Sequence, residues 1–138
     1  MINRRSFISA LYASGLSIAT LPMALRSKSF AASVLASLDK DHDGTLDLSE
    51  VKDAAASVFD KLDKDSDATL DRKEIGDRAA EAQFKQADRD HDGTLTKDDY
   101  LGLAEKLFSA ADVDKDGTLD PKELKSKAGR ALLRLIQP

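Results

Sequence analysis

Apolar residues recur at helical spacing in three short segments of the chain, residues 51–62, 75–87 and 100–111. The positions on one face are Val51, Ala55, Val58 and Leu62 in the first segment, Ala80, Phe84 and Ala87 in the second, and Leu103, Leu107 and Ala111, with Phe108 beside them, in the third. This spacing predicts helices with one buried face, and the stripe of the second segment is the weakest. At a rise of 1.5 Å per residue, each segment has room for a single helix of about 18 Å.

Two further apolar stretches flank these segments. Val34, Leu35 and Leu38 predict a short helix before them. After them, a closing helix is predicted from Leu124, Ala128, Leu132, Leu135 and Ile136, broken or bent near Gly129. No Pro- or Gly-rich linker divides residues 32–138. We therefore expect one all-α domain, a compact three-helix bundle in which each helix is shared by the two polar loops at its ends.

Four polar stretches of twelve residues adjoin the predicted helices, beginning at Asp39, Asp63, Asp88 and Asp112. They recur every 24 or 25 residues with aspartate at positions 1, 3 and 5, glycine or alanine at 6, threonine at 7, leucine at 8 and a carboxylate at 12. The pattern resembles the metal-binding loop of EF-hand proteins. Solvated acidic turns that bind nothing have no reason to repeat all these positions in constant register. The repeat therefore predicts four peripheral metal-binding loops.

The residue types suit a hard cation, because Ca²⁺ takes six to eight oxygen ligands. Positions 1, 3, 5 and 12 supply carboxylates, position 7 its backbone carbonyl, and position 9 a further ligand, often through water. The predicted ligands are Asp39, Asp41, Asp43, Thr45, Asp47 and Glu50 in loop 1; Asp63, Asp65, Asp67, Thr69, Asp71 and Glu74 in loop 2; Asp88, Asp90, Asp92, Thr94, Thr96 and Asp99 in loop 3; and Asp112, Asp114, Asp116, Thr118, Asp120 and Glu123 in loop 4. The leucines at position 8, Leu46, Leu70, Leu95 and Leu119, are expected to anchor each loop to the core and to a partner loop.

The four loops are not equal. Loops 1 and 4 are complete, whereas loop 2 has Ala68 in place of the glycine that makes the sharp turn. Holding alanine in a left-handed conformation costs on the order of 1 kcal/mol, so we expect weaker binding that survives. Loop 3 ends in Asp99, whose shorter side chain reaches the metal less easily, and it has Thr96 at position 9. Loop 3 is therefore expected to be the weakest for a large ion.

Loops 1, 2 and 4 also place an aspartate at position 9, Asp47, Asp71 and Asp120. Each then holds five carboxylates with a formal charge of −5, which a divalent ion reduces to −3 and a trivalent ion to −2. Because crowded carboxylates repel one another strongly, a higher cation charge offsets more of the repulsion. The charge count favours a trivalent ion, although high-affinity calcium loops can be equally acidic.

The first 31 residues differ in kind from the rest. They carry Arg4, Arg5, Arg26 and Lys28, no acidic residue, and an apolar or small stretch over 8–25. The arginine pair before Phe7-Ile8 resembles a twin-arginine export signal, with cleavage after Ala31 or Ala32; an ordinary secretion signal or a membrane anchor is the alternative. We therefore expect a cleaved signal over 1–31, a periplasmic location, and no membrane contact afterwards.

Charge and composition restrict the partners. Removing residues 1–31 changes the net charge from −4 to −8, which makes nucleic-acid binding implausible and cations the natural partner. The chain has no cysteine, which excludes disulfides and thiolate metal sites. Both histidines, His42 and His91, stand at loop position 4 and are expected to face solvent.

The spacing of the loops is the most specific feature, because only 12 or 13 residues separate one loop from the next. This spacing, the D-x-D-x-D-[GA]-T-L loops, the run Phe59-Asp60-Lys61-Leu62-Asp63 and the closing Ala128-Gly129-Arg130-Ala131-Leu132 resemble the lanmodulin family of exported bacterial proteins. The resemblance covers residues 34–138. It implies a three-helix bundle with peripheral loops, pairing of loop 1 with 4 and of loop 2 with 3, and selective binding of trivalent rare-earth ions (La, Ce or Nd) coupled to folding.

The chain departs from this family at loop position 2, where Lys40, Lys64, Arg89 and Val113 replace the proline of the best-known members. Selectivity is therefore less secure than metal binding. Two hypotheses stay open: a lanthanide carrier or buffer, monomeric or homodimeric, and a Ca²⁺ buffer or sensor. A calcium sensor usually binds its partner through a methionine-rich groove. Both methionines, Met1 and Met23, lie in the signal segment, so residues 32–138 have none and the sensor version is weakened. No nucleophile–base pair, phosphate loop or zinc spacing is present, so we do not expect an enzyme.

Overall fold

The computed structural model describes residues 30–138. The predicted export signal lies outside the described residues except for Phe30 and Ala31, where the first helix begins. In chain order the elements are α1 (Phe30–Leu38), β1 (Leu46–Asp47), α2 (Leu48–Leu62), β2 (Thr69–Asp71), α3 (Arg72–Ile75), the 3₁₀ turn η2 (Gly76–Arg78), α4 (Glu81–Ala87), β3 (Thr94–Thr96), α5 (Lys97–Ala111), β4 (Thr118–Leu119), the 3₁₀ turn η3 (Glu123–Lys125) and α6 (Lys127–Ile136). The described chain is mainly helical, as predicted.

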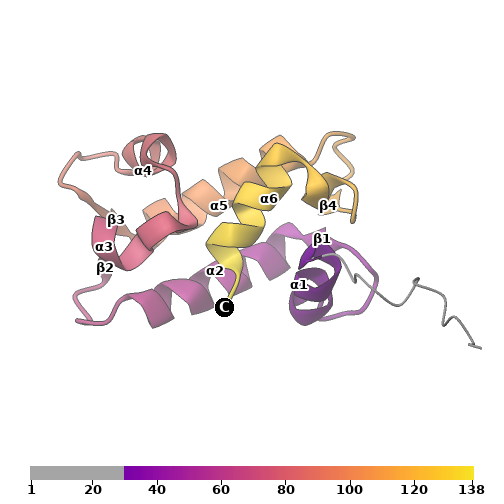
Figure 1. Ribbon diagram of the computed structural model, residues 1–138, viewed down its shortest axis with the longest axis horizontal. Coiled ribbons are helices and arrows are strands. Elements are labelled where there is room, and N and C mark those ends of the chain that lie inside the picture. The colour runs from indigo at the N-terminus through magenta and orange to yellow at the C-terminus, as the bar shows by residue number, and fades with distance from the viewer. Residues whose placement is uncertain (1–29) are drawn as a thin grey trace, which may run out of the picture.

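Two long helices, α2 and α5, form the centre of the molecule (Figure 1). Each is 15 residues long and fills one of the gaps between loops as a single helix, as the spacing predicts. They pack against each other, and α6 lies across both. Their predicted apolar faces are buried, from Val51 to Val58 in α2 and from Leu103 to Ala111 in α5. The packed centre therefore consists of α2, α5 and α6.

The prediction of one helix over residues 75–87 is wrong. Helix α3 ends at Ile75, because Gly76 adopts φ 57° and ψ −132°, a backbone region in which a Cβ atom would be strained. The chain then makes the turn η2, passes through an extended Ala79 and starts α4 at Glu81. Phe84 is buried as expected, whereas Ala80 is exposed. In the packed centre, α6 takes the position that we expected this middle segment to fill.

The predicted break in the closing segment is present, but it lies at Ser126 rather than at Gly129. Helix α6 runs through Gly129 and begins two residues earlier, where the Ser126 side chain accepts a hydrogen bond from the Gly129 N–H at 2.9 Å. The chain breaks before this cap, between η3 and α6. A serine N-cap explains the start, since it satisfies a backbone donor that the first helical turn leaves unpaired.

Short antiparallel strands join the loops in pairs. Strand β1 pairs with β4, opposing Leu46 and Leu119, and β2 pairs with β3, opposing Leu70 and Leu95. All four leucines are completely buried. These pairs confirm that loop 1 pairs with loop 4 and loop 2 with loop 3, and the two pairs lie at opposite ends of the molecule (Figure 1).

Tyr100 fixes α5 to the last turn of α6. Its hydroxyl donates to the Leu135 carbonyl at 2.7 Å, and its ring meets Phe59 edge to face, with centroids 5.8 Å apart. Burial raises the pKa of the Tyr100 hydroxyl, so it stays a donor. Within residues 30–138, no helix combines the length and apolar character needed to cross a membrane.

Candidate metal-binding loops

The same short hydrogen bonds recur in all four loops. The aspartate at position 1 accepts from the backbone N–H of position 6, from Gly44 to Asp39 at 2.9 Å, from Ala68 to Asp63 and Gly93 to Asp88 at 3.1 Å, and from Gly117 to Asp112 at 3.2 Å. The aspartate at position 5 accepts from both the N–H and the hydroxyl of the threonine at position 7, at 2.7–2.8 Å, in the pairs Asp43–Thr45, Asp67–Thr69, Asp92–Thr94 and Asp116–Thr118. These bonds curl each loop around its own carboxylates.

Each loop contains two left-handed residues. Position 6 has the positive φ that the sequence predicts, and in loop 2 Ala68 adopts φ 67°. Position 4 is left-handed as well, at His42, Ser66, His91 and Lys115, with φ between 59° and 62°. Sequence reasoning missed this second turn, although histidine is one of the residue types that enter this region more often than most. Both histidines are exposed, as predicted.

A glutamate at position 12 closes loops 1, 2 and 4. In loop 1, one carboxylate oxygen of Glu50 accepts from the Lys40 N–H at 2.6 Å and the other from the Asp47 N–H at 3.1 Å. Glu74 bridges Lys64 and Asp71 in the same way, and Glu123 bridges Val113 and Asp120. Both oxygens thus hold positions 2 and 9 together across the loop.

Loop 3 closes differently, because Asp99 is one methylene shorter. Its Oδ2 atom reaches only Thr96, accepting from the N–H at 3.3 Å and the hydroxyl at 2.6 Å. The position-2 side chain spans the gap instead, with Arg89 Nε 3.4 Å from Asp99 Oδ1. The carboxylate at position 12 of loop 3 therefore faces a cation as well as its own loop. That loop 3 is the weakest site stays a prediction.

Two of the position-9 aspartates are helix N-caps, Asp47 of α2 and Asp71 of α3. Asp47 accepts from the Glu50 N–H at 2.7 Å, and Asp71 and Asp120 each accept from two backbone N–H groups of the following turn at 2.7–2.9 Å. With the reciprocal bonds from position 12, Asp47 and Asp71 form capping boxes, whereas Asp120 makes the same bonds to the turn that precedes η3. The Asp-x-x-Glu pattern carries this signal in the sequence, but the assignment of both residues as metal ligands left the capping role unpredicted. One oxygen of each position-9 carboxylate is committed to these hydrogen bonds.

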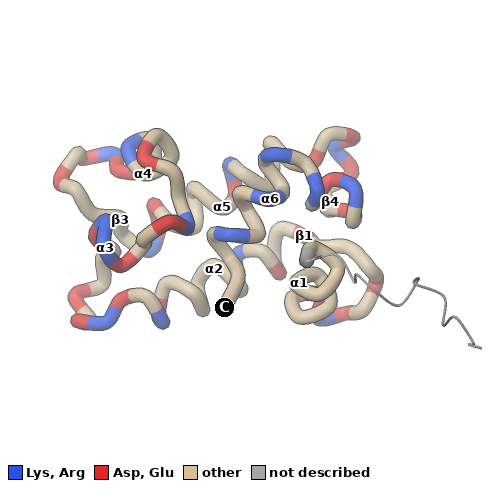
Figure 2. Tube along the Cα trace, in the orientation of Figure 1, with Lys and Arg blue, Asp and Glu red and all other residues tan. Residues whose placement is uncertain are grey.

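Ligand atoms of three acidic residues lie within 4.8 Å of one another in each loop. The groups are Asp39, Asp41 and Asp43 in loop 1; Asp63, Asp65 and Glu74 in loop 2; Asp88, Asp90 and Asp92 in loop 3; and Asp112, Asp114 and Glu123 in loop 4. The other predicted carboxylate ligands lie outside these groups: Asp47 and Glu50; Asp67 and Asp71; Asp99; and Asp116 and Asp120. The predicted ligands Thr45, Thr69, Thr94, Thr96 and Thr118 have no carboxylate and are not part of such groups. The acidic loops lie at both ends of the molecule (Figure 2).

The loop carboxylates fit a bound cation. The Oδ1 atoms of Asp88 and Asp112 are buried without a hydrogen-bond partner among the described residues. A buried carboxylate oxygen without a donor is costly, and a cation inside the loop would satisfy it. The donors are all hard oxygens, the ligand type of Ca²⁺ and similar ions.

Electrostatic strain is concentrated at position 3. Burial and the neighbouring carboxylates, Asp67 first among them, raise the pKa of Asp65. At Asp114, a hydrogen bond from the Asp116 backbone opposes the shift, but burial and the charges of Asp116 and Glu123 outweigh it and raise the pKa. At Asp39, burial opposes ionisation, yet backbone hydrogen bonds, from Gly44 above all, hold its pKa below the usual value. The loops thus hold some carboxylates in place and force others against like charges.

Three segments of the chain, residues 30–53, 80–101 and 103–126, match the family model of the EF hand. Together they cover half of the chain. The chain belongs to the EF-hand family. The matched segments contain loops 1, 3 and 4. No curated protein matches the chain.

Loop 2 lies outside the matched segments, yet its geometry is that of an EF-hand loop. It has the hydrogen bonds of positions 1, 5 and 12 and pairs its strand with that of loop 3. Loop 2 differs from the other three loops in having alanine at position 6, Ala68, and in being followed by a short helix that ends before Gly76. The EF-hand motifs and acidic loops indicate a metal-binding protein, and Ca²⁺ is the ion that such loops commonly bind.

Proposed function

We propose that this EF-hand protein binds trivalent lanthanide ions in preference to Ca²⁺ and acts in the periplasm as a carrier or buffer rather than as an enzyme. The proposal is carried by the fifth carboxylate of loops 1, 2 and 4, the aspartate at position 9. In each of these loops one oxygen of that aspartate accepts a hydrogen bond from the backbone N–H of position 12. Its charge therefore stays beside the site whether or not it contacts the ion directly.

Repulsion among the carboxylates supports a high cation charge. The raised pKa values of Asp41, Asp65 and Asp114 have burial and neighbouring loop carboxylates among their causes, against a backbone hydrogen bond in each. A trivalent ion offsets more of this repulsion than a divalent ion at the same distance. The preference then arises from charge, since both ion types accept the same oxygen donors.

Metal binding is expected to be coupled to folding, because every loop is connected to other loops. Each loop adjoins helices at its ends and contributes one strand to a pair with another loop. Loops 1 and 2 share α2, and loops 3 and 4 share α5. The pairs β1–β4 and β2–β3 join the remaining neighbours. Neutralising the loops allows these elements to order together, so binding and folding share one free energy.

The alternative is a calcium buffer, and loop 3 favours it. Its position-12 carboxylate is paired with Arg89 and its position 9 is a threonine. The remaining acidic group, Asp88, Asp90 and Asp92, carries less charge than the other loops. Such a site has less to gain from a third positive charge on the ion.

The two functions separate in a titration of residues 32–138 followed by far-UV circular dichroism. Free La³⁺ and free Ca²⁺ are set by chelator buffers in separate series. A lanthanide protein gains helix at free La³⁺ many orders of magnitude below the Ca²⁺ midpoint. Midpoints within about two decades, roughly 2.8 kcal/mol, would favour the calcium buffer.

The position-9 carboxylates are tested by replacing Asp47, Asp71 and Asp120 together with serine. Serine is as good an N-cap as aspartate, so α2 and α3 keep their caps, and a serine hydroxyl at position 120 can still accept from the following turn while the sites lose charge. We expect a larger loss of affinity for La³⁺ than for Ca²⁺. Asp98→Ser, which removes an exposed carboxylate outside the ligand positions, is the control. Equal losses for both ions would refute the charge argument.

A further inference from the structure

A cavity of about 520 Å³ lies between the interrupted segment after loop 2 and helix α6. Four cationic side chains and one carboxylate line it, namely Arg72, Arg78, Lys127, Arg134 and Asp77. The lining also includes Ala79, Ala80 and Ala131, whose small side chains leave the space between the cations open. Its volume is typical of small-molecule sites. In a chain with a net charge of −4, this local excess of positive charge is opposite to the average.

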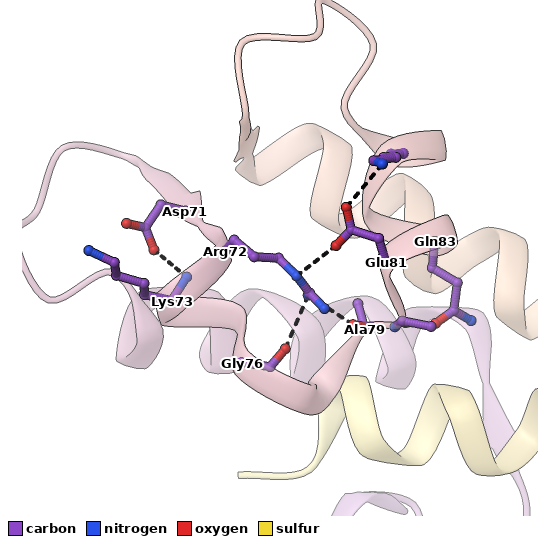
Figure 3. Close-up of polar contacts among 9 residues, drawn as sticks. Asp71, Arg72, Lys73, Gly76, Ala79, Glu81 and Gln83 are labelled. Atoms are coloured by element: carbon purple, nitrogen blue, oxygen red, sulfur yellow. Dashed lines mark hydrogen bonds and ion pairs between the residues drawn. The ribbon is translucent and has the colours of Figure 1, made fainter.

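Two of the arginines are fixed by backbone carbonyls (Figure 3 shows Arg72). Arg72 donates from Nη1 to the Gly76 carbonyl at 3.1 Å and the Ala79 carbonyl at 2.9 Å, and its Nε lies 3.1 Å from Glu81 Oε2. Arg78 donates from Nη1 to the Gln137 carbonyl at 2.5 Å and the Arg134 carbonyl at 3.3 Å. Both side chains are half-buried. These contacts hold the guanidinium groups at the cavity and leave further N–H donors available, because each guanidinium has five.

The opposite wall is a cationic face of α6. Lys127, Ala131 and Arg134 follow one another at helical spacing, and α6 has no acidic residue. Figure 2 shows this helix with basic residues, in contrast to the acidic loops. Among residues 30–138, Arg78, Lys127 and Arg134 form no ion pair. Three of the four lining cations are therefore not neutralised by an ion pair, whereas Arg72 pairs with Glu81 and Asp77 adds one carboxylate to the lining.

We propose that this cavity binds a small anion with two or more oxyanion groups, such as a di- or tricarboxylate. Guanidinium groups match carboxylate and tetrahedral oxyanions through paired hydrogen bonds. Lys127 and Arg134 are separated by about 10 Å along the helix, seven residues at 1.5 Å each. A single carboxylate does not span this distance, whereas a ligand with several anionic groups contacts α6 and Arg78 together.

The test uses the full chain in excess Ca²⁺, with its helix content checked by circular dichroism. Tricarballylate is the carboxylate probe, because it lacks the hydroxyl group of citrate and chelates metal ions more weakly. Sulfate is the tetrahedral probe and acetate the monovalent control, all at equal ionic strength. Binding is followed by the amide NMR shifts of Ala79, Ala80 and Ala131. We expect saturable shifts with tricarballylate, weaker shifts with sulfate, which has one oxyanion group, and the weakest with acetate; sulfate or acetate shifts equal to those with tricarballylate would overturn the proposal.

Variants of α6 separate a site from a diffuse positive field. Arg134→Gln and Lys127→Gln each remove one lining charge that has no ion pair among the described residues. We expect binding to weaken about five- to tenfold, roughly 1–1.4 kcal/mol. Arg130→Gln removes the same charge from an exposed position on the same helix outside the lining and should change binding less than about twofold. Asp77→Asn should tighten binding. Equal weakening by Arg130→Gln and Arg134→Gln, or no saturable shift at the cavity amides, would refute the site.

Discussion

Replacing Gly129 by alanine should destabilise the protein, although alanine is the better helix former. A Cβ atom at this position would meet the carbonyl oxygen of Glu123 and lie 2.6 Å from the Leu124 Cα atom. Both belong to the backbone, so no flexible side chain can move aside. The neighbouring N-cap bond from Gly129 to Ser126 also fixes the start of α6. Helix α6 or the turn η3 must therefore shift.

The magnitude follows from two opposing effects. Overpacking in a closely packed region costs about 1–3 kcal/mol. Exchanging glycine for alanine inside a helix returns up to about 1 kcal/mol. We expect a net loss of about 1–2 kcal/mol in the free energy of unfolding. The shift also reaches loop 4, because the Glu123 carboxylate bridges Val113 and Asp120 across that loop. The metal affinity of loop 4 should fall with the stability.

Gly102→Ala is the matched control, since Gly102 is the other glycine inside a helix among the described residues. A Cβ atom there would meet only Arg89 Nη2, at 3.3 Å, the end of a flexible and exposed side chain. This exchange should stabilise the protein by about 0.5–1 kcal/mol. Both variants are unfolded by urea at one fixed free metal concentration, because bound metal itself adds stability. A Gly129→Ala protein as stable as Gly102→Ala would show that the close approach of α6 to Glu123 has no energetic weight.

Three further changes test individual loops. Ala68→Gly should strengthen metal binding at loop 2 several-fold, because it removes the cost of about 1 kcal/mol for a left-handed alanine. A competition titration with a chelator measures the affinity of the variant, and an unchanged affinity would contradict the prediction. Asp99→Glu should raise the affinity of loop 3, since the longer side chain reaches the Arg89 N–H as glutamate does in the other loops; calorimetry that finds no gain would exclude reach as the cause. Asp65→Asn should stabilise the metal-free protein at neutral pH and weaken metal binding. The raised pKa of Asp65 favours the folded state below its unfolded value of 3.8, and this contribution is lost as pH rises through the raised value. The Asp65→Asn variant does not lose this stability, so the free energy of unfolding of the metal-free protein should vary less with pH than in the unmodified chain. An unchanged pH profile would refute the repulsion between Asp65 and the neighbouring carboxylates.

The loops could be predicted from the sequence because each ligand position has its own chemical requirement. Aspartate at positions 1, 3 and 5, the turn at position 6 and leucine at position 8 occur together, and the structure confirms the turn and the burial of the leucines. That the aspartates ligate a metal ion stays a prediction. The shared helices α2 and α5 were predictable for a related reason. Twelve residues between two loops leave room for one helix only, and its apolar face must be buried.

The middle segment and α6 could not be predicted in the same way. A gap of 13 residues with a weak apolar stripe fits one helix as well as an interrupted one. The decision lies in Gly76, which ends α3, and in Arg72, which holds the interrupted backbone through two carbonyls. A glycine one turn after the start of a helix is a stop signal, but the contacts of Arg72 are tertiary. The capping role of Asp47 was readable from the Asp-x-x-Glu pattern.

The connections between loops also affect loop 3, which the sequence predicts to be the weakest site. Its strand pairs with that of loop 2, and α5 joins it to loop 4. Under the proposed coupling of binding to folding, metal at loops 2 and 4 would order both elements, and loop 3 would then bind without bearing their conformational entropy. Because of the interruption at Gly76, the fewest helical residues connect loop 2 directly to loop 3. Between loops 2 and 3 no continuous helix transmits order, and β2–β3 with the buried pair Leu70 and Leu95 must carry it. The three-residue strand pair, rather than the chain that connects the two loops, is therefore the element through which loop 2 would promote filling of loop 3.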